Sequence, residues 1–382
     1  MTSSSHRRPP LPAAAAPLVF VPHKGRGTRW QYPHRFSQTL HEPDDDGWGC
    51  LTPPAPGESP SPATHIIEER VQSILTRNDS PDISFDLSLN PYRGCEHGCI
   101  YCYARPTHSY LNLSPGLDFE TRIVAKVNAA QRLQEALAKR HYRPLALNIG
   151  SVTDAYQPAE RHLRITRSLI EVLVACRHAF SIITKSAGVE RDLDLIAPMA
   201  QQHMAAVYVS LTTLDPALAR ILEPRAASPQ RRLQTIARLA AAGVPVGVSV
   251  SPIIPFINEP ELEQVLEAAA QAGARRAFSI PLRLPWEVSP LFQHWLAQHF
   301  PQRAQRVMAR VRDMRGGRDN DARFGSRMTG HGVWADLLRQ RFDRAVRQHG
   351  LATERLPLDL SQFQPPVSVP STATATGQQS LF

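Results

Sequence analysis

Three of the chain's five cysteines lie within eight residues, in the segment NPYRGCEHGCIYCYARPTHSY (90–110). Cys95, Cys99 and Cys102 follow the spacing C-x3-C-x2-C, and no fourth cysteine is near them. Thiolates crowded onto one loop are typical ligands of soft metal centres. These three residues are therefore the first candidates for chemistry in the chain.

Three interpretations of this spacing compete. A disulfide would leave one cysteine over and is disfavoured in a reducing cytoplasm. A structural zinc site would take His97 as its fourth ligand, although no second cysteine pair follows at the usual spacing. An iron–sulfur cube held by three thiolates would leave one iron open, which is a catalytic rather than a structural feature.

The elements around the cysteines alternate between strands and helices. Six short apolar runs rich in β-branched residues are separated by amphipathic helical stretches; the runs are 83–89, 145–151, 180–185, 205–213, 244–252 and 276–282. Ser228 and Pro229 begin one helix, and Gly243 and Gly273 end two others. This alternation predicts an α/β fold with a parallel sheet. Six units predict a partial (β/α)6 barrel, with a doubly wound sheet as the alternative.

The domain organisation follows from composition. Residues 63–285 are expected to form the partial barrel, and 286–360 a C-terminal helical extension. Residues 1–62 and 361–382 are rich in proline and small polar residues, so both are expected to be disordered tails. The cysteine loop follows the first strand, at the carboxyl-end rim where α/β sheets carry their chemistry.

The C-x3-C-x2-C spacing, with Tyr101 just before the third cysteine and a β/α body around it, resembles the radical S-adenosylmethionine (SAM) superfamily. Segments such as TDAYQPAE (153–160) and SPIIPFIN (251–258) are similar to the spore photoproduct lyase group of DNA-repair-like proteins. The resemblance implies a 4Fe–4S cluster held by Cys95, Cys99 and Cys102, with SAM on the open iron. Reductive cleavage of SAM would give a 5′-deoxyadenosyl radical that abstracts hydrogen from a substrate.

The resemblance also implies roles for residues that bind SAM: Tyr101, Thr153, Ser210, Glu223 and Arg225. Tyr101 matches an aromatic residue near the adenine, and Arg225 is expected to pair with the SAM carboxylate. The segment at Thr153 lacks the family's Gly-Gly-Glu. For each polar residue the alternative is an ordinary cap or surface ion pair.

Asp154, Tyr156 and Lys185 are the candidate catalytic residues, because they follow the second and third predicted strands on the same rim. Glu160 shares this segment, but it also suits the first turn of the next helix. Cys176 lies on an apolar helical face and is expected to pack in the core. Cys50 is the remaining candidate for the additional hydrogen-donor cysteine of spore photoproduct lyase.

Charge and the chain's end indicate partners. The formal net charge is +9, which favours a polyanion such as DNA, and the stripe Arg303, Arg306 and Arg310 recurs at helical spacing. A solvated helix face is the alternative. The terminal QQSLF resembles a sliding-clamp-binding peptide, with Gln378, Leu381 and Phe382 making the contacts. An electron donor is also implied.

Together these features predict a cytoplasmic radical SAM enzyme acting on a nucleic acid, in the manner of DNA lesion repair. No apolar run reaches the roughly 18 residues needed to cross a membrane. The same-class alternative is radical modification of RNA, a peptide or a small molecule. The alternative of a different class is a zinc-stabilised nucleic-acid-binding module without catalysis.

Overall fold

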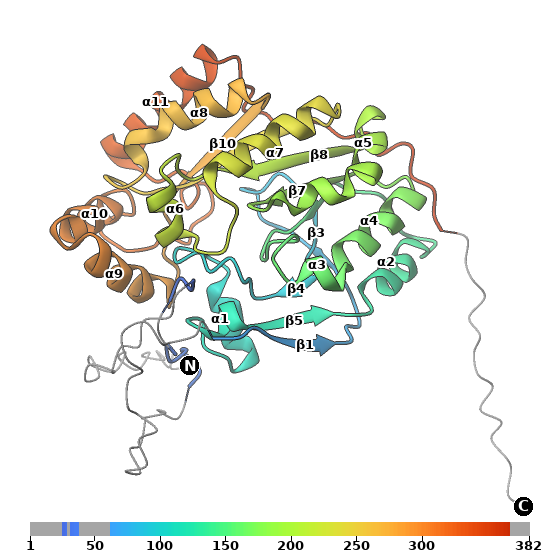
Figure 1. The fold of residues 1–382 in the computed structure, drawn as a ribbon, viewed down its shortest axis with the longest axis horizontal. Coiled ribbons are helices and arrows are strands. Elements are labelled where there is room, and N and C mark those ends of the chain that lie inside the picture. The colour runs from blue at the N-terminus through green and yellow to red at the C-terminus, as the bar shows by residue number, and fades with distance from the viewer. Residues whose placement is uncertain (1–24, 29–30, 38–61, 367–382) are drawn as a thin grey trace, which may run out of the picture.

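A seven-stranded sheet forms the centre of the molecule, in the order β10-β9-β8-β7-β6-β3-β2 (Figure 1). The computed structural model describes residues 25–28, 31–37 and 62–366. Six parallel strands match the six predicted runs: β3 (Leu87–Leu89), β6 (Leu147–Ile149), β7 (Phe180–Thr184), β8 (Ala205–Ser210), β9 (Val246–Ile253) and β10 (Arg276–Pro281). They stand side by side in chain order, and β2 (Leu75–Arg77) pairs antiparallel at the edge. The predicted partial α/β barrel is therefore confirmed.

Helices alternate with these strands and cover the sheet (Figure 1). They are α2 (Ala129–Leu137), α4 (Ile165–Ala175), α5 (Leu193–Gln201), α7 (Pro229–Ala241) and α8 (Leu262–Gln271). The main core lies between the two layers, where Ile182, Val207 and Val248 of the strands and Leu173 and Ile236 of the helices are fully buried. Every residue of β8 is buried, as expected for a parallel strand covered on both faces.

The helix α7 shows how the local sequence sets these elements. The Ser228 side chain accepts a hydrogen bond from the Arg231 amide at 3.3 Å, and Pro229 occupies the first turn, where no amide donor is needed. Gly243 ends the helix at φ +76°, a conformation that side chains disfavour. The predicted start and end of this helix are both confirmed.

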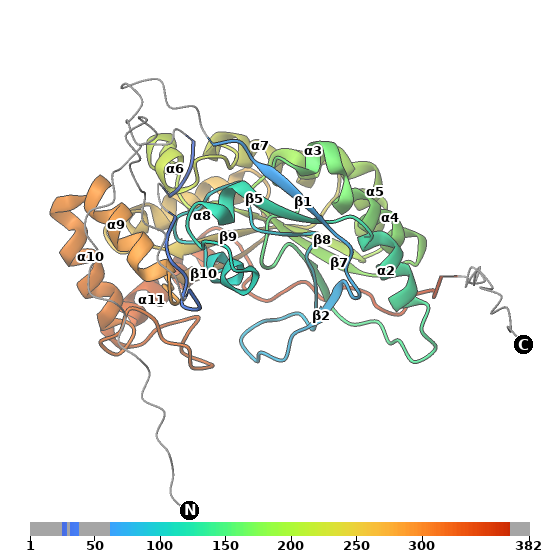
Figure 2. The same ribbon diagram turned by 90° about the horizontal axis from the view of Figure 1, so that it is seen from below.

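A second, three-stranded sheet was not predicted. It has the order β1-β5-β4, with β1 (His65–Glu69) parallel to β5 (Arg122–Lys126) and β4 (Tyr92–Arg93) antiparallel to β5. Figure 2 shows β1 and β5 crossing one face of the molecule. Because β4 directly precedes the cysteine segment, this small sheet fixes the start of that segment.

The region 286–360 contains α9 (Val288–His299), α10 (Pro301–Asp313) and α11 (Gly332–Gln348). A second core joins α9 and α10 to the cysteine segment and to α6 (Pro216–Leu222); it includes Ile100, Leu222, Phe292, Trp295 and Val307. Helices α9 and α10 therefore support the loop that carries the cysteines, whereas α11 packs in the main core.

The arginine stripe of α10 lies on one face but contacts neighbouring elements. Arg306 lies over the Phe256 ring at 4.0 Å, and Arg310 lies over the Trp334 ring at 4.6 Å. Arg303 donates a hydrogen bond to the Phe256 carbonyl at 3.2 Å. These contacts show that the three arginines pack against neighbouring elements in addition to carrying positive charge.

The inner ends of the two segments expected to be disordered make defined contacts with the folded body. Arg26 donates a hydrogen bond to the Glu120 carbonyl at 2.7 Å, and Gln31 donates to Asp118 at 2.9 Å. At the other end the Gln364 amide donates to the Cys176 carbonyl at 2.8 Å. Polar contacts hold both segments, so neither shows the apolar periodicity that predicts an element.

The remaining parts of both tails, with Cys50 and the terminal QQSLF, lie outside the described residues. Over the described ranges, every helix is too short or too polar to cross a lipid bilayer.

Candidate metal-cluster site

The three cysteines lie on the segment after β4, at the carboxyl end of β3. All three are free thiols; Cys95 and Cys99 are buried and Cys102 is half-buried. The Cys95 amide donates to the Phe119 carbonyl at 2.9 Å, and the Ile100 amide donates to the Leu222 carbonyl at 3.1 Å. The backbone of the segment is thus tied to other elements on both sides of Cys99.

Arg105 organises this segment from within. Its side chain is fully buried, and it donates to the carbonyls of Cys99 at 2.9 Å and Gly98 at 3.1 Å. It also pairs with the fully buried carboxylate of Glu120 at 2.6 Å. A guanidinium suits this position because its five donors diverge in one plane and remain charged when buried.

Gly98 is required by the path of the chain. Its φ is +68°, and an added Cβ would lie 2.7 Å from Oε2 of Glu120. The same carboxylate accepts hydrogen bonds from the amides of Gly27 at 2.7 Å and Thr28 at 3.0 Å. Close approach of Gly98 to Glu120 therefore links the cysteine segment to residues 27 and 28.

Three free thiols are the residue types that a cationic centre preferring sulfur would take as ligands. Burial raises the pKa of the Cys95 thiol, and the charges of Asp154, Cys99 and Cys102 raise it further. Burial raises the pKa of Cys99 to about 12, with Lys185 acting against it. Neighbouring thiols thus oppose the ionisation of Cys95 and Cys99, and a bound cationic centre would reverse this effect. Among the described residues, no group of three or more His, Cys, Asp or Glu is arranged to hold a metal ion.

Tyr101 and Lys185 meet beside Cys99. The Tyr101 hydroxyl donates to Glu223, and the Lys185 ammonium lies 5.9 Å from the centre of the Tyr101 ring. Burial disfavours the charged form of Lys185, but the negative charges of Cys99 and Glu223 raise its pKa overall. Lys185 therefore brings a positive charge to the cysteines.

Glu223 is the centre of a buried polar network. It accepts hydrogen bonds from Tyr101 and from Thr212 at 2.5 Å, and it pairs with Arg232. Burial opposes ionisation of Glu223, but Arg232 and Lys185 outweigh it and lower the pKa to about 2. Glu223 thus carries a negative charge one layer behind the cysteine segment.

Asp154 and Thr153 hold the segment from the β6 side. The Thr153 hydroxyl donates to the Gly94 carbonyl at 2.6 Å. Asp154 accepts from the Thr184 hydroxyl and the Lys185 amide, both at 2.7 Å, and lies 3.3 Å from Nδ1 of His97. Burial raises the pKa of Asp154, but His97 and these hydrogen bonds outweigh it and lower the pKa.

Arg225 and Ser210 lie near the segment in different ways. The Arg225 amide donates to the His97 carbonyl at 3.3 Å, and its guanidinium lies 3.3 Å from Glu96. The Ser210 carbonyl accepts from Arg232 at 3.0 Å, and Arg232 also pairs with Glu223. A cavity of about 510 Å³ opens beside Arg225, lined by His97, Tyr156, Ser186 and Gly188 among others.

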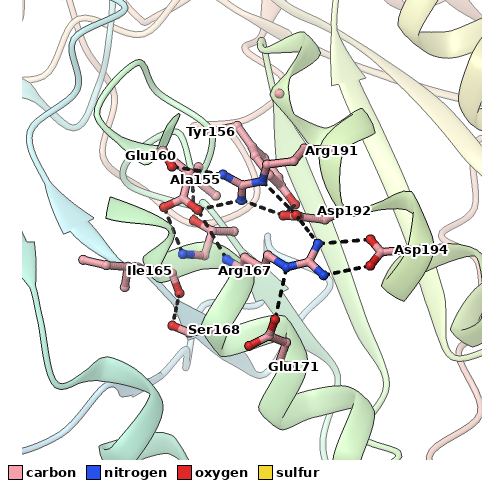
Figure 3. Close-up of polar contacts among 12 residues, drawn as sticks. Ala155, Tyr156, Glu160, Ile165, Arg167, Ser168, Glu171, Arg191, Asp192 and Asp194 are labelled. Atoms are coloured by element: carbon pink, nitrogen blue, oxygen red, sulfur yellow. Dashed lines mark hydrogen bonds and ion pairs between the residues drawn. The ribbon is translucent and has the colours of Figure 1, made fainter. Parts of the chain in front are cut away.

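Tyr156 and Glu160 belong to a separate ion-pair network (Figure 3). The Tyr156 hydroxyl donates to Asp192 at 3.0 Å, and Arg191 joins Asp192 to Glu160. Glu160 also accepts the Thr166 amide at 3.0 Å, so it satisfies the first turn of α4. The structure thus directs the Tyr156 hydroxyl towards this network, and Cys176 lies in the main core.

The sequence interpretation missed three buried charged residues: Arg105, Glu120 and Arg232. Arg105 stands three residues after Cys102, and nothing in its local pattern separates it from an exposed arginine. Arg232 lies on the buried face of α7, where an arginine among apolar residues was the available signal.

Comparison with known proteins gives a matching family model and several relatives of similar sequence. A family model for the radical SAM superfamily matches residues 89–269. The chain is 39% identical over 226 residues to an uncharacterized protein of Mycobacterium tuberculosis, covering 59% of this chain and 66% of that protein. It is 28% identical over 214 residues to an uncharacterized protein of Methanocaldococcus jannaschii, covering 56% of this chain and 76% of that protein. The match thus spans just under two thirds of the mycobacterial relative.

Solved structures of spore photoproduct lyase are similar in fold. One mutant superposes with a TM-score of 0.54 at 16% identity, covering 76% of this chain and 82% of that chain. Another, with bound AdoMet and dinucleoside spore photoproduct, gives 0.52 at 17% identity with the same coverage. At these identities the likeness establishes a shared fold.

Proposed function

Because residues 89–269 belong to the radical SAM superfamily, we propose that this protein holds a 4Fe–4S cluster on Cys95, Cys99 and Cys102 and cleaves SAM reductively. The observation that carries the proposal is the set of three free thiols, Cys95, Cys99 and Cys102, on one loop at the carboxyl end of the parallel sheet. That end is where α/β folds place their chemistry.

The chain's own residues would hold and shield the cofactors. When bound, the cluster and SAM would supply a 5′-deoxyadenosyl radical that removes a hydrogen atom from the substrate. Lys185 balances negative charge beside Cys99, and Tyr101 is fixed by Glu223 as a wall of the site. Thr153 and Asp154 hold the loop in place through the Gly94 carbonyl and the His97 side chain.

Arg225 is the proposed partner of the SAM carboxylate. Its guanidinium is half-buried and lies beside the cavity next to His97, where it contacts Glu96 at 3.3 Å and the Thr64 hydroxyl at 3.4 Å. A guanidinium in this position has donors left to bind a carboxylate. Ser210 is proposed as a further contact of SAM, because it ends β8 on the same rim as the cysteine segment.

Anaerobic reconstitution with iron and sulfide tests the proposal. We expect about four irons per chain, and we expect methionine and 5′-deoxyadenosine to form from SAM after reduction with dithionite. A chain with Cys95→Ala, Cys99→Ala and Cys102→Ala should take up no cluster and leave SAM intact. Cys176→Ala is the matched control, because this cysteine lies in the main core.

Two outcomes would contradict the proposal. One is a protein that takes up no iron but retains zinc, which favours the non-catalytic alternative. The other is a cluster whose loading is unchanged in the triple cysteine variant. A reducing cytoplasm, where free thiols persist, is the proposed compartment.

We propose nucleic acid as the substrate class. The net charge of +9 supports a polyanionic partner. The spore photoproduct lyase structure of similar fold carries a dinucleoside photoproduct, which supports a base in a nucleic acid as the site of reaction. Transfer of deuterium from a labelled oligonucleotide into 5′-deoxyadenosine tests this, and transfer only from peptides or small molecules would refute it.

The terminal QQSLF is proposed to recruit the protein to a sliding clamp. Gln378, Leu381 and Phe382 are the proposed contacts, with the two apolar side chains entering a pocket on the clamp. Deletion of residues 378–382 should abolish clamp binding in a pull-down while leaving SAM cleavage unchanged. Unchanged clamp affinity after deletion would refute the role.

A further inference from the structure

Exposed aromatic residues of this protein lie beside arginines. In the described ranges, the exposed large hydrophobic side chains include five aromatic ones, which are 49% to 68% exposed: Phe36, Tyr103, Tyr110, Trp286 and Phe324. Each ring centre lies within 6 Å of a guanidinium carbon, supplied by Arg35, Arg283 or Arg327. We call these eight residues the arginine–aromatic surface.

Arg35 gathers three of the rings. Its guanidinium lies 4.6 Å from the Trp286 ring, 4.7 Å from Phe36 and 5.2 Å from Tyr110. It is held by an ion pair with the buried carboxylate of Glu287 at 2.9 Å. Because its charge and position are fixed, the three rings form a preorganised group with their outer faces open to solvent.

The surface crosses the mouth of the partial barrel. Tyr103 directly follows the third cysteine; its hydroxyl donates to the Ser151 carbonyl, just past β6, and its ring lies 5.9 Å from Arg283, just past β10. Trp286 follows three residues after Arg283. The aromatic groups therefore stand on the same rim as the cysteine segment.

The far end of the surface is also fixed to that rim. The fully buried Arg315 donates to the carbonyl of Leu282, after β10, at 3.0 Å and to the carbonyl of Arg327 at 2.8 Å. Arg327 lies 4.6 Å from the Phe324 ring. Burial, and after it the nearby charge of Arg327, lowers the pKa of Arg283, while Arg327 itself forms an ion pair with Asp82 at 2.6 Å.

Flat rings interleaved with guanidinium groups are the chemistry that binds unpaired nucleotides. Each base offers a π face to an aromatic ring, and each phosphate offers a charge to an arginine. In a duplex those π faces are covered by neighbouring bases, so the rings select strands that are open or locally unpaired.

We propose that the arginine–aromatic surface binds an unpaired stretch of nucleic acid and leads it to the mouth of the barrel. The proposal rests on the proposed function, because it names the form in which a nucleic-acid substrate reaches the cysteine segment. It also assigns binding to this surface rather than to the stripe on α10.

Fluorescence anisotropy with the reconstituted full-length protein tests the proposal. The probes are labelled 12-nucleotide thymidine and uridine strands and the thymidine strand annealed to its complement. We expect both single strands to bind at least tenfold more tightly than the duplex. Trp286→Ala and Tyr110→Ala should each weaken single-strand binding by about fivefold to 150-fold, since stacking contributes about 1–3 kcal/mol per base.

Matched variants separate this surface from the alternatives. Val333→Ala, at an exposed apolar residue of α11, and Arg306→Ala, on the α10 stripe, should leave affinity unchanged. Arg283→Ala should reduce the salt dependence of binding by about one phosphate contact, whereas Trp286→Ala should leave the salt slope as it is. Trp286→Phe should retain most of the affinity because a stacking face remains.

The outcomes distinguish this inference from the proposed function. Equal affinity for duplex and single strand, or loss of affinity on Arg306→Ala alone, would overturn the assignment. A change in self-association rather than in oligonucleotide binding on Trp286→Ala would also overturn it, in favour of a protein-docking surface. A protein that cleaves SAM but binds neither single strand retains the enzyme proposal and refutes this one. A protein that binds single strands but takes up no iron retains this inference about the surface and refutes the enzyme proposal.

Discussion

Replacing Arg105 with methionine should destabilise the whole cysteine segment. The side chain is fully buried and donates to the carbonyls of Gly98 and Cys99 as well as to the Glu120 carboxylate. Methionine has similar length but no donors, so Glu120 would remain as a buried charge without its cationic partner. We expect less cluster uptake as well as lower stability, because the two carbonyls lie on the segment that carries the cysteines.

The magnitude follows from the burial of both partners. Removing one member of a buried ion pair costs about 3–5 kcal/mol, and each buried acceptor left unsatisfied costs about 1–3 kcal/mol. Two backbone amides still donate to Glu120, which limits the loss. We therefore expect the free energy of unfolding to fall by about 3–5 kcal/mol. This is a large part of the total free energy of unfolding of a typical folded protein, which is about 5–15 kcal/mol.

Urea denaturation of the cluster-free protein measures this change, and iron content after reconstitution measures the effect on the site. Arg132→Met is the matched control, because Arg132 forms a partly exposed ion pair with Glu135 at 2.6 Å. That control should lose no more than about 1 kcal/mol. If Arg105→Met lost no more than the control and took up a full complement of iron, the structural role assigned to Arg105 would be refuted.

Three further predictions follow from the site. Gly98→Ala should lower the free energy of unfolding by about 1–3 kcal/mol more than Gly243→Ala, because both have positive φ but only the first Cβ meets a carboxylate oxygen; equal losses by urea denaturation would count against the tight approach. The pKa of Glu223 is lowered from 4.5 to about 2 in the folded state, so ionised Glu223 contributes about 3 kcal/mol to the free energy of unfolding above pH 4.5, and this contribution is lost as pH falls towards 2. The difference in unfolding free energy between the natural protein and Glu223→Gln should therefore shrink from pH 4.5 to pH 2. A difference that does not change with pH would contradict this. Lys185→Met should move the midpoint potential of the reconstituted cluster to more negative values in a redox titration, because a positive charge beside Cys99 is lost. Lys139→Met, at an exposed lysine, should leave the potential unchanged. Equal potentials for Lys185→Met and the natural protein would refute the charge-balancing role of Lys185.

The parallel sheet was predictable because buried parallel strands read as continuous apolar runs. All six runs became strands, and the capping residues Ser228, Pro229 and Gly243 marked the ends of α7. The sheet of β1, β5 and β4 was not predictable, because β1 is short and mostly exposed and carries no apolar alternation. Its strands exist through pairing between distant segments.

The candidate site was predictable only where residue type and spacing carry chemistry. The cysteines stand out by spacing, and Lys185 and Asp154 stand out by following strands. Glu160 could not be assigned from the sequence, because a carboxylate at that position suits either a reactive rim or the start of a helix. In the structure it accepts a hydrogen bond from the first turn of α4. Arg105 shows the other limit, because burial of an arginine depends on tertiary contacts that leave no local pattern.

The contacts of Glu120 bear on how this protein can be divided. Gly27 and Thr28 donate to its carboxylate, and Arg26 donates to its carbonyl, although all three precede the region that the superfamily model matches. A fragment cut to residues 89–269 would keep the cysteines yet lose these donors. The region that the superfamily model matches therefore depends on contacts from outside it, and we expect shortened versions that begin no later than Gly25 to be more stable than those that begin at residue 89.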